Sequence, residues 1–146
     1  MSGEVALRGF RPEDTDELAY VWREGQRSTG LSVPSEVELK GRIDRRDEAG
    51  WTLTIVEAEG RIAGFMALKL TEGVLDQLFI HPDFQGGGVG ARLLALAKAA
   101  MPGGFTLGTD AANTGARRFY ETWGMRLASL GVHPRRGFVV ANYAWP

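Results

Sequence analysis

A glycine-rich loop between a predicted strand and a predicted helix constrains this chain more than any other stretch. Residues 85–90 read QGGGVG, and they follow the apolar segment 74–80, which is typical of a buried strand. His81-Pro82 ends that strand, because proline has no N–H and keeps its predecessor out of the helical region. Four glycines in five positions cost conformational entropy, and a plain turn needs fewer. The loop therefore indicates a ligand that approaches the bare backbone.

The helix that follows the loop gives this part of the chain a positive end. Its first N–H groups have no acceptor inside the helix, and the helix dipole adds positive potential there. Together with the glycines, this predicts a cradle for a pyrophosphate. A P-loop is excluded, because that motif needs a lysine and a hydroxyl after its last glycine, and Ala91-Arg92 follow Gly90.

A dinucleotide-binding (Rossmann) fingerprint is the second alternative. Gly86, Gly88 and Ala91 fit its G-x-G-x-x-A pattern, and Asp110 lies about 20 residues further on, where a ribose ligand would stand. That fingerprint should open where the strand ends, however, and residues 81–85 intervene here. A single match of this kind is weak support for a nucleotide-binding domain, and it leaves Asp110 as an ordinary loop residue.

Composition narrows the class of protein. With 146 residues we expect one domain, residues 1–146, with enough apolar side chains for a core. The 17 basic and 18 acidic residues favour neither a nucleic acid nor a membrane as partner. The sequence contains no cysteine, and its two histidines lack spaced carboxylates, so we expect no metal site. Without a signal-peptide pattern or a long apolar run, we expect a cytoplasmic protein.

Hydrophobic periodicity and turn residues predict a mixed α/β fold. Strands are expected over residues 4–10, 51–57, 61–70, 74–80, 105–109, 125–130 and 138–143, and helices over 12–27, 34–48, 91–101 and 114–123. The connection from 74–80 to 105–109 passes through a helix, so those two strands should be parallel in an otherwise mostly antiparallel sheet.

A second motif follows the loop at a fixed distance. Residues 113–125 read NTGARRFYETWGM, which is similar to N-x-x-A-x-x-F/L-Y-x-x-x-G-F, with Met125 in place of phenylalanine. Residues 85–90 also fit Q/R-x-x-G-x-G/A. With both motifs in this order the chain resembles the GNAT superfamily of N-acetyltransferases, whose glycine loop binds the pyrophosphate of acetyl-coenzyme A. The resemblance is specific over 74–125, and it implies the acyl-CoA N-acyltransferase fold, with helices on both faces and a splayed parallel strand pair.

The resemblance also implies roles for named residues. Tyr120 would stand near the sulfur as general acid, and Asp76 would act as base or orient a water. The residues implied in binding acetyl-coenzyme A are Leu78, Phe79, Ile80, Gln85, Gly86, Gly87, Gly88, Val89, Gly90, Ala91, Asn113 and Arg117.

Each of these roles has a structural alternative. Tyr120 also fits the core side of a helix, and Asn113 also fits a helix cap. Asp76 should share a strand face with Leu78 and Ile80, or else point to solvent as a strand-end residue. Arg117 is equally explained by a solvated helix face.

The implied activity is direct transfer of an acetyl group from acetyl-coenzyme A to a primary amine. The acceptor would be an unidentified small molecule, amino acid or peptide. Basic residues in and between the first two predicted helices and in the last hairpin favour an acceptor that carries a carboxylate. Direct transfer follows from the lack of a cysteine for an acyl-enzyme. The alternative is a non-catalytic coenzyme A-binding or sensor module on the same fold. Dimerisation through the C-terminal strands is common in the family, so the resemblance allows a homodimer, but the sequence itself does not show one.

Overall fold

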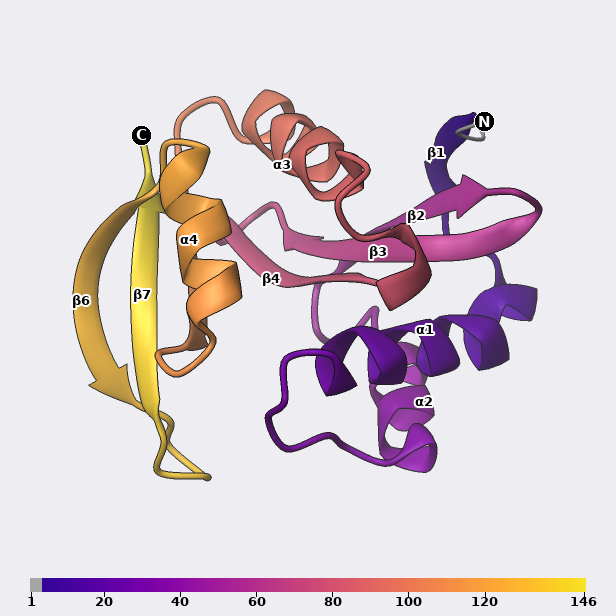
Figure 1. The fold of residues 1–146 in the computed structure, drawn as a ribbon, viewed down its shortest axis with the longest axis horizontal. Coiled ribbons are helices and arrows are strands. Elements are labelled where there is room, and N and C mark those ends of the chain that lie inside the picture. Colours follow the sequence, from indigo (N-terminus) through magenta and orange to yellow (C-terminus); the bar gives the residue numbers. More distant parts are fainter. Residues whose placement is uncertain (1–3) are drawn as a thin grey trace.

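Seven strands and four α-helices follow one another in a computed structural model that describes residues 4–146 (Figure 1). Residues 1–3 of the expected domain lie outside the described part. The strands are β1 (Val5–Gly9), β2 (Thr52–Ala58), β3 (Arg61–Lys69), β4 (Val74–Ile80), β5 (Phe105–Asp110), β6 (Arg126–Val132) and β7 (Val139–Trp145). The helices are α1 (Thr15–Arg27), α2 (Glu36–Asp44), α3 (Val89–Ala100) and α4 (Thr114–Thr122), with short 3-10 turns at Pro12–Asp14 and Pro82–Phe84. The predicted order of elements is confirmed.

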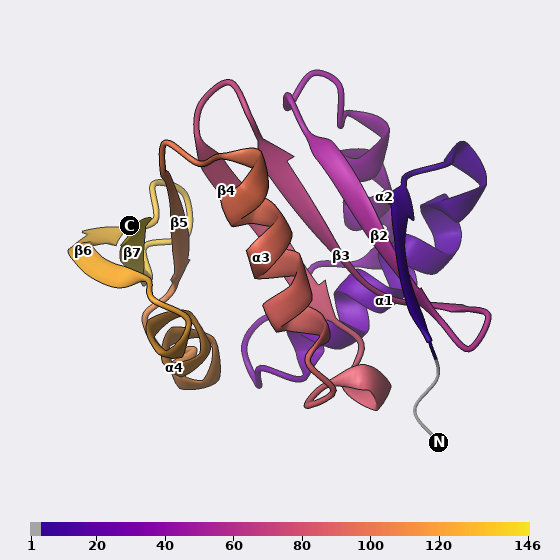
Figure 2. The ribbon, with the colours of Figure 1, turned by 90° about the horizontal axis from the view of Figure 1, so that it is seen from above.

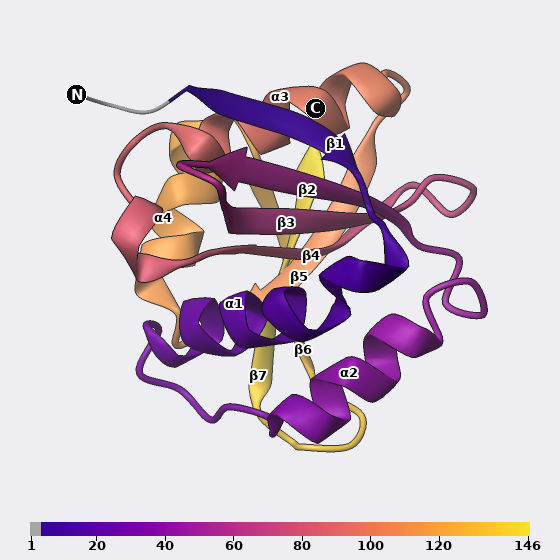
Figure 3. The ribbon, with the colours of Figure 1, turned by 90° about the vertical axis from the view of Figure 1, so that its right-hand side faces the viewer.

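One sheet contains all seven strands, in the order β1-β2-β3-β4-β5-β7-β6. Every neighbouring pair is antiparallel except β4 and β5, which are parallel as predicted. These two strands are in register at a single residue pair, Val74 with Thr106, and beyond it they diverge. The sheet turns strongly at this point, because β7 runs across the direction of β3 in Figures 1 and 3.

Helices cover both faces of the sheet. Figures 2 and 3 show α3 on one face of β2–β4 and the pair α1 and α2 on the other. The α3 face holds a core cluster that includes Leu93 and Met66, and the α1/α2 face holds a second one around Trp22 and Phe65. Strand β3 therefore has buried side chains on both sides. No helix within residues 4–146 is both long and apolar enough to span a bilayer.

Helix α2 is shorter than its sequence pattern predicts. It begins at Glu36 and not at Pro34, because the Ser35 hydroxyl accepts a hydrogen bond from the Glu38 N–H at 3.1 Å and caps the helix. Of its predicted apolar side, Leu39 and Ile43 are fully buried, whereas Val37 is 81% exposed. Two side chains therefore anchor this helix at the rim of the α1/α2 face.

A bulge in β4 changes the direction of the Asp76 side chain. Gln77 pairs with Ala67 and Leu75 with Leu68, so Asp76 is an extra residue without a partner on β3. Its carboxylate accepts a hydrogen bond from the indole N–H of Trp51, a side chain that packs on the α1/α2 face.

The prediction that Asp76 shares a face with Leu78 and Ile80 is therefore wrong. Those two residues pack against the cluster on the α3 face, whereas Asp76 lies with Trp51 on the opposite one. Simple alternation of side chains fails here because one extra residue reverses the side-chain direction.

Helix α1 packs directly on the backbone of β4 through Gly25. A Cβ atom at Gly25 would lie 3.0 Å from the Ile80 carbonyl oxygen and 3.0 Å from the Phe79 Cβ. The missing side chain thus allows close approach of the helix to the end of the strand.

We predict opposite stability changes for two glycine-to-alanine variants within helices. Gly25→Ala should lower the free energy of unfolding by about 1–2 kcal/mol, because overpacking against backbone outweighs the gain in helix propensity. Gly41→Ala should raise it by up to about 1 kcal/mol, because its new methyl group meets only the mobile end of Arg45, at 3.3 Å. Urea unfolding measures both values, and equal effects would contradict this packing.

Candidate functional site

A cavity of about 550 Å³ is lined by residues from the end of β4, the start of α3, the end of α1 and helix α4. Figure 1 shows how these elements are arranged. The lining of the cavity brings together most of the predicted coenzyme-binding residues and Tyr120: Leu78, Phe79, Ile80, Gln85, Gly86, Gly88, Val89, Gly90, Ala91 and Asn113. We call this cavity the α3–α4 pocket. Gly87 and Arg117 are the two predicted coenzyme-binding residues outside its lining.

The glycine loop presents unpaired backbone donors to the α3–α4 pocket. Gly86 and Gly88 both have φ of 82°, in the left-handed region, and a Cβ at either would meet no atom within 4 Å. Gly88 is the residue that caps α3. The N–H groups of residues 86–91 donate no hydrogen bond to any part of the chain between residues 4 and 146. This is the arrangement that binds phosphate groups at helix N-termini.

The second half of β4 has one free backbone edge. Leu78, Phe79 and Ile80 pair with β3 on one side, but β5 has already diverged on the other. The Gln85 side chain donates hydrogen bonds to the Ile80 carbonyl and to the Ser28 hydroxyl, each at 3.0 Å. Gln85 therefore fastens the loop to both β4 and the end of α1.

Asn113 caps helix α4 and also faces the α3–α4 pocket. Its side-chain oxygen accepts a hydrogen bond from the Ala116 N–H at 3.1 Å, which confirms the cap. The side-chain amide N–H groups make no hydrogen bond to residues 4–146, so they are free to bind a ligand.

Tyr120 lies at the inner wall of the α3–α4 pocket and is 7% exposed. Its ring packs between those of Phe119 and Tyr143, at centroid distances of 5.2 and 6.2 Å. Burial raises the pKa of the Tyr120 phenol above its ordinary value, because a phenolate would be poorly solvated there. The hydroxyl donates to no acceptor among residues 4–146, and it is not among the fully buried polar atoms, so it is accessible from the cavity that Tyr120 lines.

Arg117 points away from the α3–α4 pocket. Its Nε donates to the Tyr143 hydroxyl at 3.0 Å and its Nη1 donates to the Ala111 carbonyl at 3.3 Å. The Tyr143 hydroxyl in turn donates to Glu121. These contacts connect α4 to β7, so the geometry does not support the predicted contact of Arg117 with coenzyme.

A second cavity, of about 430 Å³, lies between the first half of β4, the end of β5 and the β6–β7 hairpin. Asp76, Gln77 and Asp110 contribute to its lining. The Asp76 Oδ2 atom accepts the Trp51 N–H at 2.7 Å and lies 3.9 Å from the Lys69 Nζ. We call this cavity the hairpin pocket. Within residues 4–146, no group of three or more His, Asp or Glu side chains is arranged to hold a metal ion.

Sequence reasoning missed the contribution of α1 to the α3–α4 pocket. Gly25, Ser28 and Thr29 line it. The signal for Gly25 was present, because this glycine falls on the apolar side of the predicted helix, but only the folded chain shows that β4 is its neighbour.

Three comparisons place these features among known proteins. The family model described as "Acetyltransferase (GNAT) family" matches residues 12–125. Over 126 residues, 84% of each chain, this chain is 31% identical to the peptidyl-lysine N-acetyltransferase YjaB of Salmonella typhimurium.

Solved structures agree with that match. The solution structure of apo-form YjaB from Escherichia coli superposes with a TM-score of 0.76 at 25% identity, covering 97% of both chains. The PaiA N-acetyltransferase of Thermoplasma acidophilum, solved in complex with coenzyme A, superposes with a TM-score of 0.75 at 19% identity, over 97% of this chain and 99% of that one. With the glycine loop, the diverging strand pair and a family match over most of its length, the chain belongs to the GNAT family of acetyltransferases.

Proposed function

We propose that this protein transfers an acetyl group from acetyl-coenzyme A, bound in the α3–α4 pocket, to a primary amine that arrives from the α1/α2 face of β4. One observation carries the proposal: a single cavity is lined by the glycine loop with its unpaired N–H groups, by the free edge of β4 and by Tyr120. A pyrophosphate, an amide-containing arm and a thioester sulfur need these three groups in this order.

The coenzyme would lie along the lining from loop to strand. Its pyrophosphate would accept hydrogen bonds from the backbone N–H groups of residues 86–91. Its pantetheine amides would pair with the free edge of Leu78–Ile80, as an added strand does, and with the free amide N–H groups of Asn113. The GNAT structure with coenzyme A bound supports this ligand for the fold.

Backbone donors, Tyr120 and Asp76 of this chain would take part in the transfer step. The amine nitrogen attacks the thioester carbonyl carbon, a C–N bond forms, and the C–S bond breaks with its electron pair going to sulfur. Backbone donors at the β4 bulge would stabilise the oxyanion. Tyr120 would donate a hydrogen bond to the departing thiolate. A thiol has an ordinary pKa of about 8.5, whereas burial raises the pKa of the Tyr120 phenol above its ordinary value. Tyr120 would therefore stabilise the thiolate by a hydrogen bond and not by complete transfer of its proton.

Asp76 would receive the proton that the attacking amine loses. Only its Oδ2 is engaged by Trp51 and Lys69, so Oδ1 remains available in the hairpin pocket. In this arrangement the two reactants would approach β4 from opposite sides, the coenzyme from the α3 face and the amine from the α1/α2 face, and meet at the bulge. The relative named as a peptidyl-lysine N-acetyltransferase favours a lysine side chain as the amine.

Gly88→Ala should weaken coenzyme A binding by roughly 10-fold or more, because its methyl group would stand where phosphate approaches donors. The matched control is Gly50→Ala, which has a similar φ of 73° and equally open surroundings far from the pocket lining. Both variants should lose about 1–2 kcal/mol of stability to left-handed strain. Calorimetric titration measures the affinity, and equal binding by both variants would refute the cradle.

Arg117→Ala should lower the free energy of unfolding, because the Tyr143 hydroxyl and the Ala111 carbonyl lose their donor. Coenzyme A affinity should stay unchanged. Arg118→Ala, on the exposed side of the same helix, should change neither quantity. Weaker coenzyme binding by Arg117→Ala at unchanged stability would instead restore the role predicted from sequence.

Tyr120→Phe tests whether the protein is an enzyme or only binds coenzyme. We expect kcat to fall by about 100-fold with unchanged coenzyme affinity, because the hydroxyl acts on the leaving thiolate. Stability should hold, since the hydroxyl has no partner within residues 4–146. Tyr20→Phe, at a 47% exposed position, is the control. Thiol release with acetyl-coenzyme A and a lysine peptide measures the rate, and an unchanged rate would remove Tyr120 from the mechanism.

A further inference from the structure

Arg42 lies partly buried on the α1/α2 face, between α2 and the β4 bulge. Its guanidinium carbon is 4.8 Å from the centroid of the Trp22 ring, and Trp22 is fully buried. Trp22 packs on Trp51 at a centroid distance of 5.9 Å, and Trp51 binds the Asp76 carboxylate. A continuous layer of side chains therefore connects Arg42 to the residue proposed to accept the amine proton.

The Arg42 guanidinium has no hydrogen-bond or ion-pair partner in this layer. Within residues 4–146, no carboxylate oxygen lies within 4.0 Å of it, and its N–H groups donate no hydrogen bond. Burial lowers the pKa of Arg42 below its ordinary value, and the charges of Asp76 and Glu38 offset this only in part. Stacking on Trp22 occupies one face of the guanidinium and leaves the N–H groups at its edge free.

The carboxylates nearest to Arg42 are already engaged. Glu38 pairs with Arg136 of the β6–β7 loop at 3.5 Å, and Asp76 is held by Trp51 and lies near Lys69. Arg45 and Arg136 are close enough to act on Arg42 as like charges. Asp76 and Glu38 act on Arg42 more strongly than these two arginines do, but neither carboxylate reaches the planar fork of its guanidinium.

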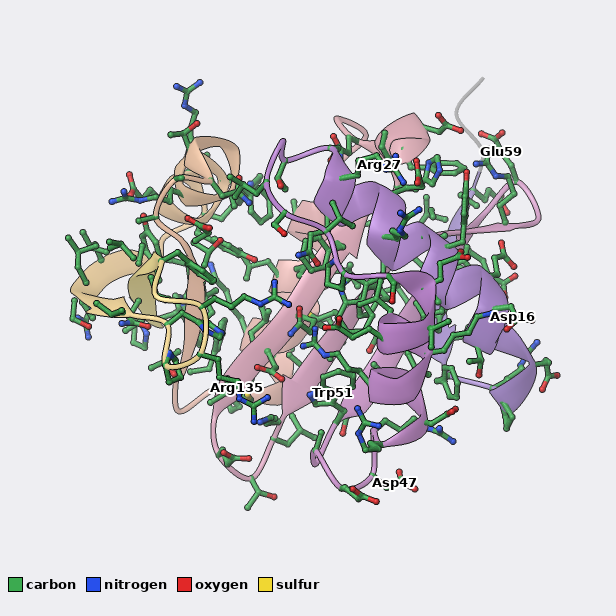
Figure 4. All side chains as sticks on the ribbon, turned by 90° about the horizontal axis from the view of Figure 1, so that it is seen from below. Asp16, Arg27, Asp47, Trp51, Glu59 and Arg135 are labelled. Atoms are coloured by element: carbon green, nitrogen blue, oxygen red, sulfur yellow. The ribbon has the colours of Figure 1, made fainter. Side chains whose placement is uncertain are left out.

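Arg42 lies on the side from which the amine would arrive. Figure 4 shows the underside of the molecule, with Trp51 and with Arg135 of the β6–β7 loop labelled on it. The ion pair of Glu38 with Arg136 brings that loop against α2, next to Arg42. The hairpin pocket begins at the same loop and at Asp76.

We propose that Arg42 binds a carboxylate of the acceptor, so that the substrates are amines that carry a carboxylate near the reacting nitrogen. The planar fork of an arginine fits a carboxylate with two parallel hydrogen bonds. The carboxylate can come from the α-carboxyl group of a free amino acid or from an acidic residue beside a lysine in a peptide. This inference rests on the proposed function, because it needs the acceptor on the α1/α2 face.

Two matched acceptor pairs distinguish these sources. The first pair is N-α-acetyl-lysine and N-α-acetyl-lysinamide, and the second is the capped dipeptides Glu-Lys and Gln-Lys. With saturating acetyl-coenzyme A, the wild-type protein should favour the carboxylate member of at least one pair by roughly 10-fold or more in kcat/KM. The pair that shows the preference identifies the source, and no preference in either pair overturns the proposal.

Arg42→Gln should remove that preference, so that the kcat/KM values for the two members of the pair become equal. Arg42→Lys should retain only part of it, because a lysine keeps the charge without the fork. Lys40→Gln removes a positive charge from the same helix, but Lys40 pairs with Asp16 at 3.1 Å, so this control should keep the preference. An equal loss in Lys40→Gln, or a preference that survives in Arg42→Gln, overturns the role of Arg42.

A lack of turnover with all four acceptors would contradict the proposed function and not this site. In that case the same four compounds are titrated into the coenzyme A complex and followed by amide NMR. Carboxylate-selective binding that Arg42→Gln abolishes upholds the site, and binding without selectivity overturns it. Thermal unfolding checks that each variant is folded. If a variant is not folded, the preference of the wild-type protein between the two members of each pair still decides the proposal.

Discussion

The divergence of β4 from β5 is the constraint on which the rest of the site depends. A parallel pair that continued in register would satisfy both edges of β4 and fill the sheet at this point. Here the register holds at Val74 and Thr106 alone, so the backbone of Leu78–Ile80 faces a cavity and not a neighbouring strand. Two residues stabilise the diverged strand. Gly25 lets α1 pack on its backbone, and the Gln85 side chain donates a hydrogen bond to the Ile80 carbonyl. The free edge is thus held rigidly, as a binding surface must be.

A single extra residue then divides the chemistry between the two faces of the sheet. The bulge at Asp76 turns its carboxylate toward Trp51, while Leu78 and Ile80 keep their side chains on the α3 face. In the proposed reaction the thioester and the amine approach one strand from opposite sides and meet where its backbone is irregular. The unpaired Arg42 of α2 is close enough to Asp76 for their charges to interact.

Sequence reasoning predicted the elements and most of the pocket, because both depend on local rules. Periodicity located every strand and helix, and the run of glycines before a helix predicted the bare backbone that lines the pocket. That Gly86 and Gly88 are left-handed is a finding of the structure. It placed Asp76 on the wrong face, since one bulge reverses alternation without a trace in composition. It treated Arg117 as a coenzyme ligand, because the competing partner, Tyr143, stands 26 residues away on another strand. Arg42 gave no signal at all, since an unpaired arginine is recognised only after its neighbours are known.

The central claim is that a coenzyme binds to exposed main-chain groups of β4 and of the glycine loop. An amide NMR titration of the intact protein with coenzyme A tests it most directly, because each backbone N–H reports separately. We predict large shifts for the amides of residues 78–80 and 86–91, and none for β6 at the far edge of the sheet. Binding that leaves those amides unchanged, or that shifts β6 instead, would contradict the account.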